Sequence, residues 1–186
     1  MAVIGLSGVS IAACGAPDTS KPRQIAADRL PPGLVEAVEE TTTTAPPVTV
    51  PAAVVRVWMV QDPGLVAVSR QVPSPVTVHA VVAALLAGSS PDDEPGVRSA
   101  WTTAEQVTEV SVTAGIAMID LAEGFLELPA GEQLLAVGQM VLTLTDQPGI
   151  GQVQFQRDGE RIRVPGADGT TLLRPVSRDD YTALVQ

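Results

Sequence analysis

Apolar and polar residues alternate in the chain after residue 53, and this pattern predicts strands at residues 54–60 and 65–72. The residues between them, QDPG, are typical of a tight turn. A helical pattern follows, with Ser74 as the expected N-cap, Pro75 at the first helical position and Gly88 as the stop signal. The spacing predicts five buried side chains in this helix: Val78, Val81, Val82, Leu85 and Leu86.

The second half of the chain repeats this arrangement. Alternation predicts strands at residues 107–112 and 116–121 that join at a short turn, and further strands within GQVQFQRD and ERIRVP that join at Asp158 and Gly159. Between the two pairs, apolar residues recur at helical spacing: Leu134, Val137, Val141 and Leu144. The order β-β-α-β-β-α-β-β predicts an α+β fold, with two helices packed on one face of a mixed or antiparallel sheet.

The first fourteen residues differ from this pattern, because they are apolar or small and end at the only cysteine, Cys14. Residues 2–13 are too few to span a bilayer, but they are typical of the apolar core of a signal peptide. The sequence IAAC resembles the bacterial lipobox, in which the cysteine is lipidated and becomes the first residue. No Lys or Arg precedes Lys21, so either translation starts upstream of Met1 or the run is not an export signal.

A polar segment rich in Pro, Thr and charged residues separates Cys14 from the first predicted strand. Such a composition is typical of a tether that follows a lipid anchor. The sequence therefore predicts three parts: a lipoprotein signal peptide at residues 1–14, a linker at residues 15–53 and one folded domain at residues 54–186. A buried structural cysteine in a chance apolar N-terminus is the alternative reading of Cys14.

Composition excludes several classes of function. The chain carries 11 Lys and Arg against 21 Asp and Glu, a formal net charge of -10, so we expect no nucleic-acid partner. Two Trp, two Phe and one Tyr leave few rings for stacking on sugars or flat cofactors, and we expect no cofactor. One Cys and one His do not provide an ordinary structural zinc site, and we expect no metal.

Candidate catalytic groups are few. His79 lies in the first predicted helix, and no serine of the domain lies in a G-x-S-x-G motif, so the sequence predicts no catalytic residue of this type. Paired carboxylates would allow glycoside cleavage. The candidates for such pairs are Asp92, Asp93 and Glu94, Asp120 with Glu123, and Asp179 with Asp180. Solvated turns are the alternative for these acids.

The segment from Val55 to Tyr181 resembles the GerMN domain, a family of sporulation and spore germination that occurs in lipoproteins of Gram-positive, including actinobacterial, envelopes. The matching stretches include VRVWMVQDPGLVAVSRQV, VHAVVAALLAG, EVSVTAGIAMIDLAEGF and RPVSRDDY. The resemblance implies a small α+β domain without known catalysis that acts as an envelope interaction module. Its architecture is similar to ring-building domains of sporulation secretion channels, which implies self-association as one behaviour.

Three residues of the matching region are of particular interest. Asp120 lies where the family pattern has an acid at a strand end, and we interpret it as a structural acceptor for the backbone N–H groups of a turn. Trp58 and Trp101 are candidates for an interaction surface, since exposed tryptophans often anchor partners. The alternative is that both rings pack inside the domain.

Together these observations predict a non-enzymatic lipoprotein, anchored by its lipid to the extracytoplasmic face of the cell membrane. Its domain would contact an envelope protein or peptidoglycan in assembly or signalling related to sporulation or germination. Two alternatives stay open: a sensor of cell-wall fragments that signals to a membrane kinase, and a cell-wall hydrolase.

Overall fold

The computed structural model describes residues 51–186, so Cys14, the predicted signal peptide and nearly all of the predicted linker lie outside the described residues. The helices are α1 (Val78–Leu86), α2 (Glu123–Leu126), α3 (Ala130–Thr145) and the 3-10 helices η2 (Ala104–Gln106) and η3 (Arg178–Leu184). The strands are β1 (Ala52–Gln61), β2 (Gly64–Pro73), β3 (Val107–Thr113), β4 (Ile116–Leu121), β5 (Gln152–Arg157), β6 (Glu160–Arg161), β7 (Val164–Pro165) and β8 (Thr171–Leu172). The predicted α+β class is confirmed.

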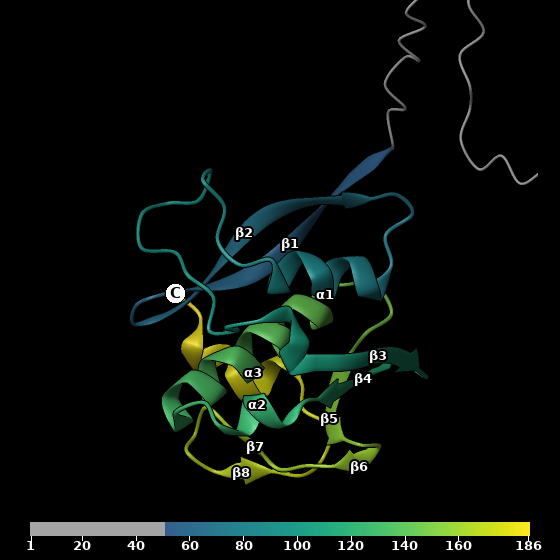
Figure 1. Ribbon diagram of the computed structural model, residues 1–186, viewed down its shortest axis with the longest axis vertical. Coiled ribbons are helices and arrows are strands. Elements are labelled where there is room, and N and C mark those ends of the chain that lie inside the picture. The colour runs from purple at the N-terminus through teal and green to yellow at the C-terminus, as the bar shows by residue number, and fades with distance from the viewer. Residues whose placement is uncertain (1–50) are drawn as a thin grey trace, which may run out of the picture. The chain divides into compact units, whose positions relative to one another are not determined.

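The strands are divided among separate sheets instead of forming the single sheet that the sequence predicts. β1 and β2 form an antiparallel hairpin, while β3, β4, β5 and β6 form a mixed sheet in which β4 and β5 are parallel. β7 and β8 form a further antiparallel pair. Figure 1 shows the β1–β2 hairpin at one end of the domain and β6, β7 and β8 at the other, with α1 and α3 between them.

Two hairpin turns lie where the sequence places them. Ala114 and Gly115 join β3 to β4 with φ angles of 51° and 80°, and Asp158 and Gly159 join β5 to β6 with φ angles of 52° and 79°. Two consecutive positive φ angles match the right-handed twist of the strands, and glycine adopts them without steric cost. Both turns were therefore predictable from local sequence.

The start of α1 differs from the prediction. Thr77, not Ser74, is the N-cap, and its hydroxyl accepts a hydrogen bond from the N–H of Ala80 at 3.2 Å. Pro75 precedes the helix instead of occupying its first position. At the other end, Gly88 has a φ of 79° directly after the C-cap, as a helix stop requires. Of the predicted core residues, Val81, Val82 and Leu85 are buried, and Val78 and Leu86 are partly buried.

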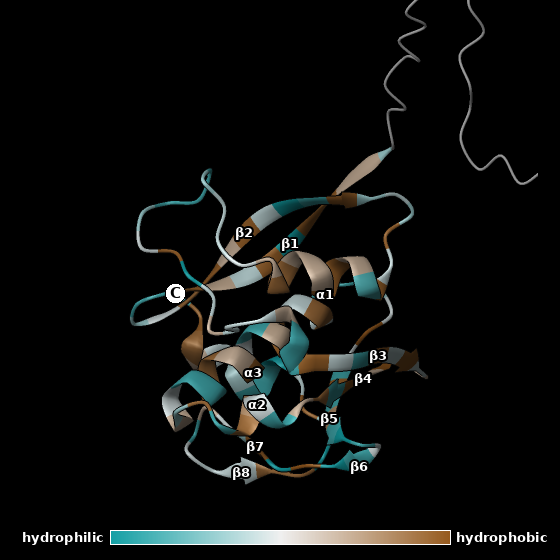
Figure 2. Cartoon of the chain, viewed as in Figure 1, coloured by the Kyte–Doolittle hydropathy of each residue, from teal (hydrophilic) through white to brown (hydrophobic). Residues whose placement is uncertain are grey.

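The centre of the domain is α3, which is buried without interruption from Ala136 to Leu144. It packs against β1, β5, α1 and η3, so elements of two sheets share one core. Figure 2 shows the contrast in hydropathy between α1, mostly apolar beside this core, and β6, which is hydrophilic at the periphery. Within residues 51–186, no helix combines the length and apolar character needed to cross a membrane.

Candidate binding site

The two tryptophans that the sequence proposes as partner anchors are buried. Trp58 is 5% exposed, its indole N–H donates to Asp146 Oδ2 at 2.9 Å, and the guanidinium of Arg178 lies 5.1 Å from its ring centroid. Trp101 is 4% exposed and stacks on Phe125 with ring centroids 5.5 Å apart. The expectation of an exposed tryptophan surface is therefore wrong, and the alternative that both rings pack inside the domain holds: Asp146 and Arg178 lie against Trp58, and Phe125 of α2 lies against Trp101.

Asp120 is buried at the end of β4 and holds the turn between β5 and β6. Its carboxylate accepts hydrogen bonds from the backbone N–H of Asp158 at 3.0 Å and of Gly159 at 2.9 Å. The hydroxyl of Thr108 donates to the same carboxylate at 3.3 Å. A small cavity of about 300 Å³ lies beside it, lined also by Glu123. Asp120 thus links the end of β4 to the turn between β5 and β6, as the sequence interpretation proposes.

The other candidate carboxylates either pair with arginines or are exposed. Arg70 donates to both oxygens of Asp93 at 2.6 Å, and this hydrogen bonding lowers the pKa of Asp93. In the same way, Arg174 lowers the pKa of Asp180, to which it donates at 2.6 and 3.0 Å. The remaining candidates in the two loops are exposed: Asp92, Glu94 and Asp179.

The described residues that could serve as catalytic or metal-binding groups do not cluster. His79 is exposed on α1. Among residues 51–186, no three His, Cys, Asp or Glu side chains gather so that they could hold a metal ion. The candidate site of the described residues is instead a groove in the surface.

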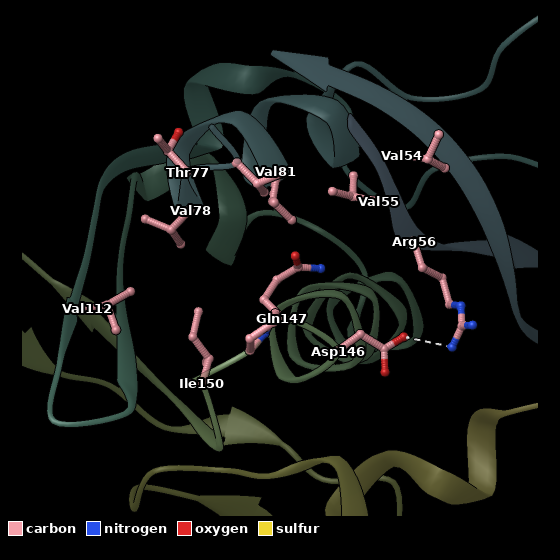
Figure 3. A pocket seen from close by; sticks show the side chains of 13 residues that line it. Val54, Val55, Arg56, Thr77, Val78, Val81, Val112, Asp146, Gln147 and Ile150 are labelled. Carbon is pink, nitrogen blue, oxygen red and sulfur yellow. Dashed lines mark ion pairs between the residues drawn. The ribbon is translucent and has the colours of Figure 1, made fainter. Parts of the chain in front are cut away.

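A groove of about 750 Å³ lies between the first half of β1, the start of α1, β3 and the loop that follows α3 (Figure 3). Its lining residues are Val54, Val55, Arg56, Val76, Thr77, Val78, Val81, Val112, Asp146, Gln147, Pro148, Gly149 and Ile150. Three of the five exposed large hydrophobic residues in the described chain line it: Val54 (69% exposed), Val76 (43%) and Val112 (40%). Such clustering of exposed apolar side chains marks a candidate binding surface.

The interior of the groove is apolar with one polar group at its centre. Figure 3 shows Val112 at one end and Val54 at the other, with the amide of Gln147 between them. Val55 and Val81 are buried at its base. Gln147 donates to the carbonyl of Thr143 at 3.3 Å. A few polar groups on an apolar lining are typical of a site that orients a partner.

One end of the groove is charged. Asp146 is the C-cap of α3, where the negative end of the helix dipole disfavours a carboxylate. Arg178 lies 2.6 Å from Asp146 Oδ1, and Arg56 lies 3.5 Å from Asp146 Oδ2. Two guanidinium groups therefore share one carboxylate, and the side chain of Arg56 remains 62% exposed. This leaves a cation available at the rim of the groove.

The outer edge of β1 is closed along its second half. The N–H of Trp58 donates to the hydroxyl of Thr143 at 2.9 Å, and the amide of Gln139 donates to the carbonyl of Trp58 at 2.9 Å. Val60 exchanges two backbone hydrogen bonds of 2.8 Å with Arg98. Side chains of α3 and one loop residue thus replace a neighbouring strand.

The same edge is open along the first half. Backbone groups of a strand alternate in direction, so the N–H and C=O of Val54 and Arg56 point the same way as those of Trp58 and Val60. Within residues 51–186 these groups of Val54 and Arg56 have no hydrogen-bond partner. We call residues 52–56 the open half of β1 and residues 57–61 the closed half.

Sequence reasoning missed the residues that close one half of β1 and bound the groove. Gln139 and Thr143 are polar residues four apart in the buried part of α3, and this spacing is the signal that would have indicated a buried polar face. The grouping of Arg56, Asp146 and Arg178 has no such local signal, since the three are far apart in the sequence.

Comparisons with known proteins agree with this architecture. Residues 56–163 match the family model Germane, described as sporulation and spore germination. Among solved structures, the first GerMN domain of the sporulation protein GerM from Bacillus subtilis is 20% identical with a TM-score of 0.53; the match covers 68% of this chain and 98% of that one. The structure of its tandem GerMN domains is 20% identical with a TM-score of 0.51, and covers 76% of this chain.

The chain spans 50% of the tandem structure's length. A comparison with curated proteins gives no match. At 20% identity, the two structural likenesses show a shared fold.

Proposed function

Because this chain belongs to the sporulation and spore germination family, we propose that it is a tethered, non-catalytic binding protein of the cell envelope that recruits a protein partner through its groove. The family match and the shared fold confirm the expected GerMN-type domain. The observation that supports the binding role is the groove itself, where exposed valines gather beside an open strand edge.

The chemistry of the groove favours a protein segment over a cell-wall fragment. No aromatic side chain lines it, so it offers no platform for stacking on a sugar ring. Valine is the most frequent residue in its lining, and valine side chains gain from burial against the aliphatic surface of a partner. Calorimetry with purified muropeptides tests the sensor alternative, for which heat of binding that is lost in a Val112→Asp variant would be the supporting result.

Photocrosslinking in the native membrane tests the binding role. A photoreactive amino acid replaces Val112 inside the groove, and in the matched control it replaces Leu173, which is equally exposed outside the groove. We expect a defined crosslinked partner from position 112 and none from position 173. Equal crosslinking from both positions, or none from position 112, would contradict the proposal.

The membrane tether is the second part of the proposal, and it rests on the residues around Cys14. Thioether formation at Cys14 and acylation of its new amino group would supply more than one chain, and stable anchoring needs two such signals. Labelled palmitate is expected to enter the wild type and not Cys14→Ser. If the label still enters Cys14→Ser, the proposal of a lipid anchor at Cys14 is contradicted, whereas the proposed binding role of the groove is not affected.

A further inference from the structure

We propose that the partner contributes an extended segment that adds as a strand to the open half of β1. Its main chain pairs with Val54 and Arg56, an apolar side chain enters the groove, and a carboxylate meets Arg56. This inference rests on the proposed function, because it describes how the same groove holds its partner.

The first support is the outer main chain of the open half, which has no hydrogen-bond partner among residues 51–186. Val54 and Arg56 are two residues apart, and their N–H and C=O groups both point outward. A neighbouring strand forms its hydrogen bonds with every second residue in this way. In the closed half, Thr143, Gln139 and Arg98 satisfy the equivalent groups. An open edge that borders an apolar groove is the arrangement used for strand addition, with main-chain bonds for affinity and pockets for specificity.

The second support is the side-chain pattern along β1. Val54 and Arg56 lie on one face of the strand, while Val55 lies on the other face at the base of the groove. Directly opposite residues of paired strands share a face. The added segment therefore has an apolar residue opposite Val54, a second apolar residue opposite Val55 and an acidic residue opposite Arg56.

Charge selects a segment of another protein over a second copy of this chain. Each copy has a formal net charge of -10, so two copies repel each other over long range. A short segment with one carboxylate has little of this repulsion and gains the exposed guanidinium of Arg56. The occupant is therefore a mainly apolar extended peptide with a single acidic residue.

The test uses a blocked, fluorescein-labelled peptide of sequence Ser-Thr-Glu-Val-Val-Ser, which places Glu opposite Arg56 when it pairs antiparallel to β1. A second peptide has Lys in place of Glu. With the wild-type protein, we expect the Glu peptide to bind more tightly than the Lys peptide. Arg56→Glu weakens the Glu peptide about threefold and reverses the order of the two. Arg163→Glu, the same charge change at an exposed residue outside the groove, leaves the order as in the wild type.

N-methylation of the peptide tests the main-chain pairing. Methylation of an amide that faces β1 should weaken binding about tenfold, whereas methylation of the next amide, which faces away, should have little effect. Equal effects at both positions, with the methyl signals of Val76 and Val112 still shifted by the peptide, would overturn strand addition and leave the groove as a binding site. Absence of binding by either peptide would overturn the inference, while crosslinking from position 112 would still support the proposed function.

A second copy is the remaining occupant that the experiment identifies. Sedimentation of the protein without peptide should give a monomer. A concentration-dependent dimer that protects the amides of Val54 and Arg56 from exchange would show that a second copy takes the edge, and it would overturn the inference.

Discussion

The two halves of β1 have the same pairing with β2 but opposite surroundings. In the closed half, both faces and the outer edge are covered, and residues 57–60 are all buried. In the open half, Val54 and Arg56 are exposed and their outward main-chain groups are free of partners within residues 51–186. One strand therefore serves the core at one end and presents a binding edge at the other.

The difference is explained by where α3 ends. Its residues Gln139 and Thr143 lie against Trp58, and its C-cap Asp146 reaches only as far as Arg56. Past that point the chain turns into the loop of residues 147–151, and the groove begins. The length of α3 thus sets the boundary between a stabilised edge and an available one.

The largest expected effect is loss of the closed edge. Gln139→Leu leaves the carbonyl of Trp58 and the N–H of Ala100 buried without partners, and we expect a loss of about 3 kcal/mol in the free energy of unfolding, measured in urea. Gln152→Leu, at an exposed position, should change it by less than about 0.5 kcal/mol.

A milder variant keeps this prediction testable if Gln139→Leu does not fold. Thr143→Val removes only the acceptor of the Trp58 N–H, and should cost about 1.5 kcal/mol. Stability equal to the wild type in both variants would show that the edge of the closed half is not held by α3.

The next largest effect is expected at Asp146, whose carboxylate lies between the two halves of β1. Asp146→Ala deprives the buried indole N–H of Trp58 of its acceptor and leaves Arg178 unpaired, so we expect a loss of about 2 kcal/mol. Urea unfolding monitored by tryptophan fluorescence measures this loss. Asp179→Ala, at an exposed carboxylate, is the control, and an equal loss there would contradict the role of Asp146.

A third prediction concerns the strand on the far side of the open half. Arg70 lies opposite Val55 in the β1–β2 register, and its Nη1 and Nη2 groups both donate to the carboxylate of Asp93. Removal of the charge in Asp93→Asn should cost about 1.5 kcal/mol at neutral pH.

The pH dependence of this pair has a definite sign. Arg70 lowers the pKa of Asp93 in the folded state, so the ionised carboxylate stabilises the fold at pH values above its ordinary pKa of about 3.9. That stabilisation disappears as the pH falls through the lowered pKa. In acid, the wild type should therefore lose more stability than Asp93→Asn. Parallel pH profiles of the two proteins would contradict this.

The smallest expected effect on stability is at the open half. Val54 is largely exposed, so Val54→Ser should change the free energy of unfolding by less than about 0.5 kcal/mol. The same variant should weaken the Ser-Thr-Glu-Val-Val-Ser peptide severalfold, because its apolar neighbour is lost. A large loss of stability with unchanged peptide binding would reverse the roles assigned to the two halves.

The sequence predicts those parts of the fold that local chemistry determines. Alternation locates β1 to β5 within a few residues, and the two turns with Gly115 and Gly159 are placed correctly. The predicted start of α1 was wrong because Ser74 and Thr77 both carry a hydroxyl suited to an N-cap. Only the path of the chain into the helix selects between them.

The groove depends on tertiary contacts, which no local pattern encodes. A period of two in β1 indicates two faces, but it does not say that Trp58 is covered by Arg178 and Asp146 or that the sheet ends at β1. The division of the strands into separate sheets has the same cause. An open edge is therefore recognised only when the neighbours of every strand are known.

Residue-resolved amide hydrogen exchange of the free, monomeric domain tests the difference between the two halves most directly. The account predicts that the amides of Val54 and Arg56 exchange at least about a hundredfold faster than those of Trp58 and Val60, since only the latter pair is hydrogen-bonded at the outer edge. Equal protection of all four amides would contradict it, because the edge of β1 would then be closed along its whole length.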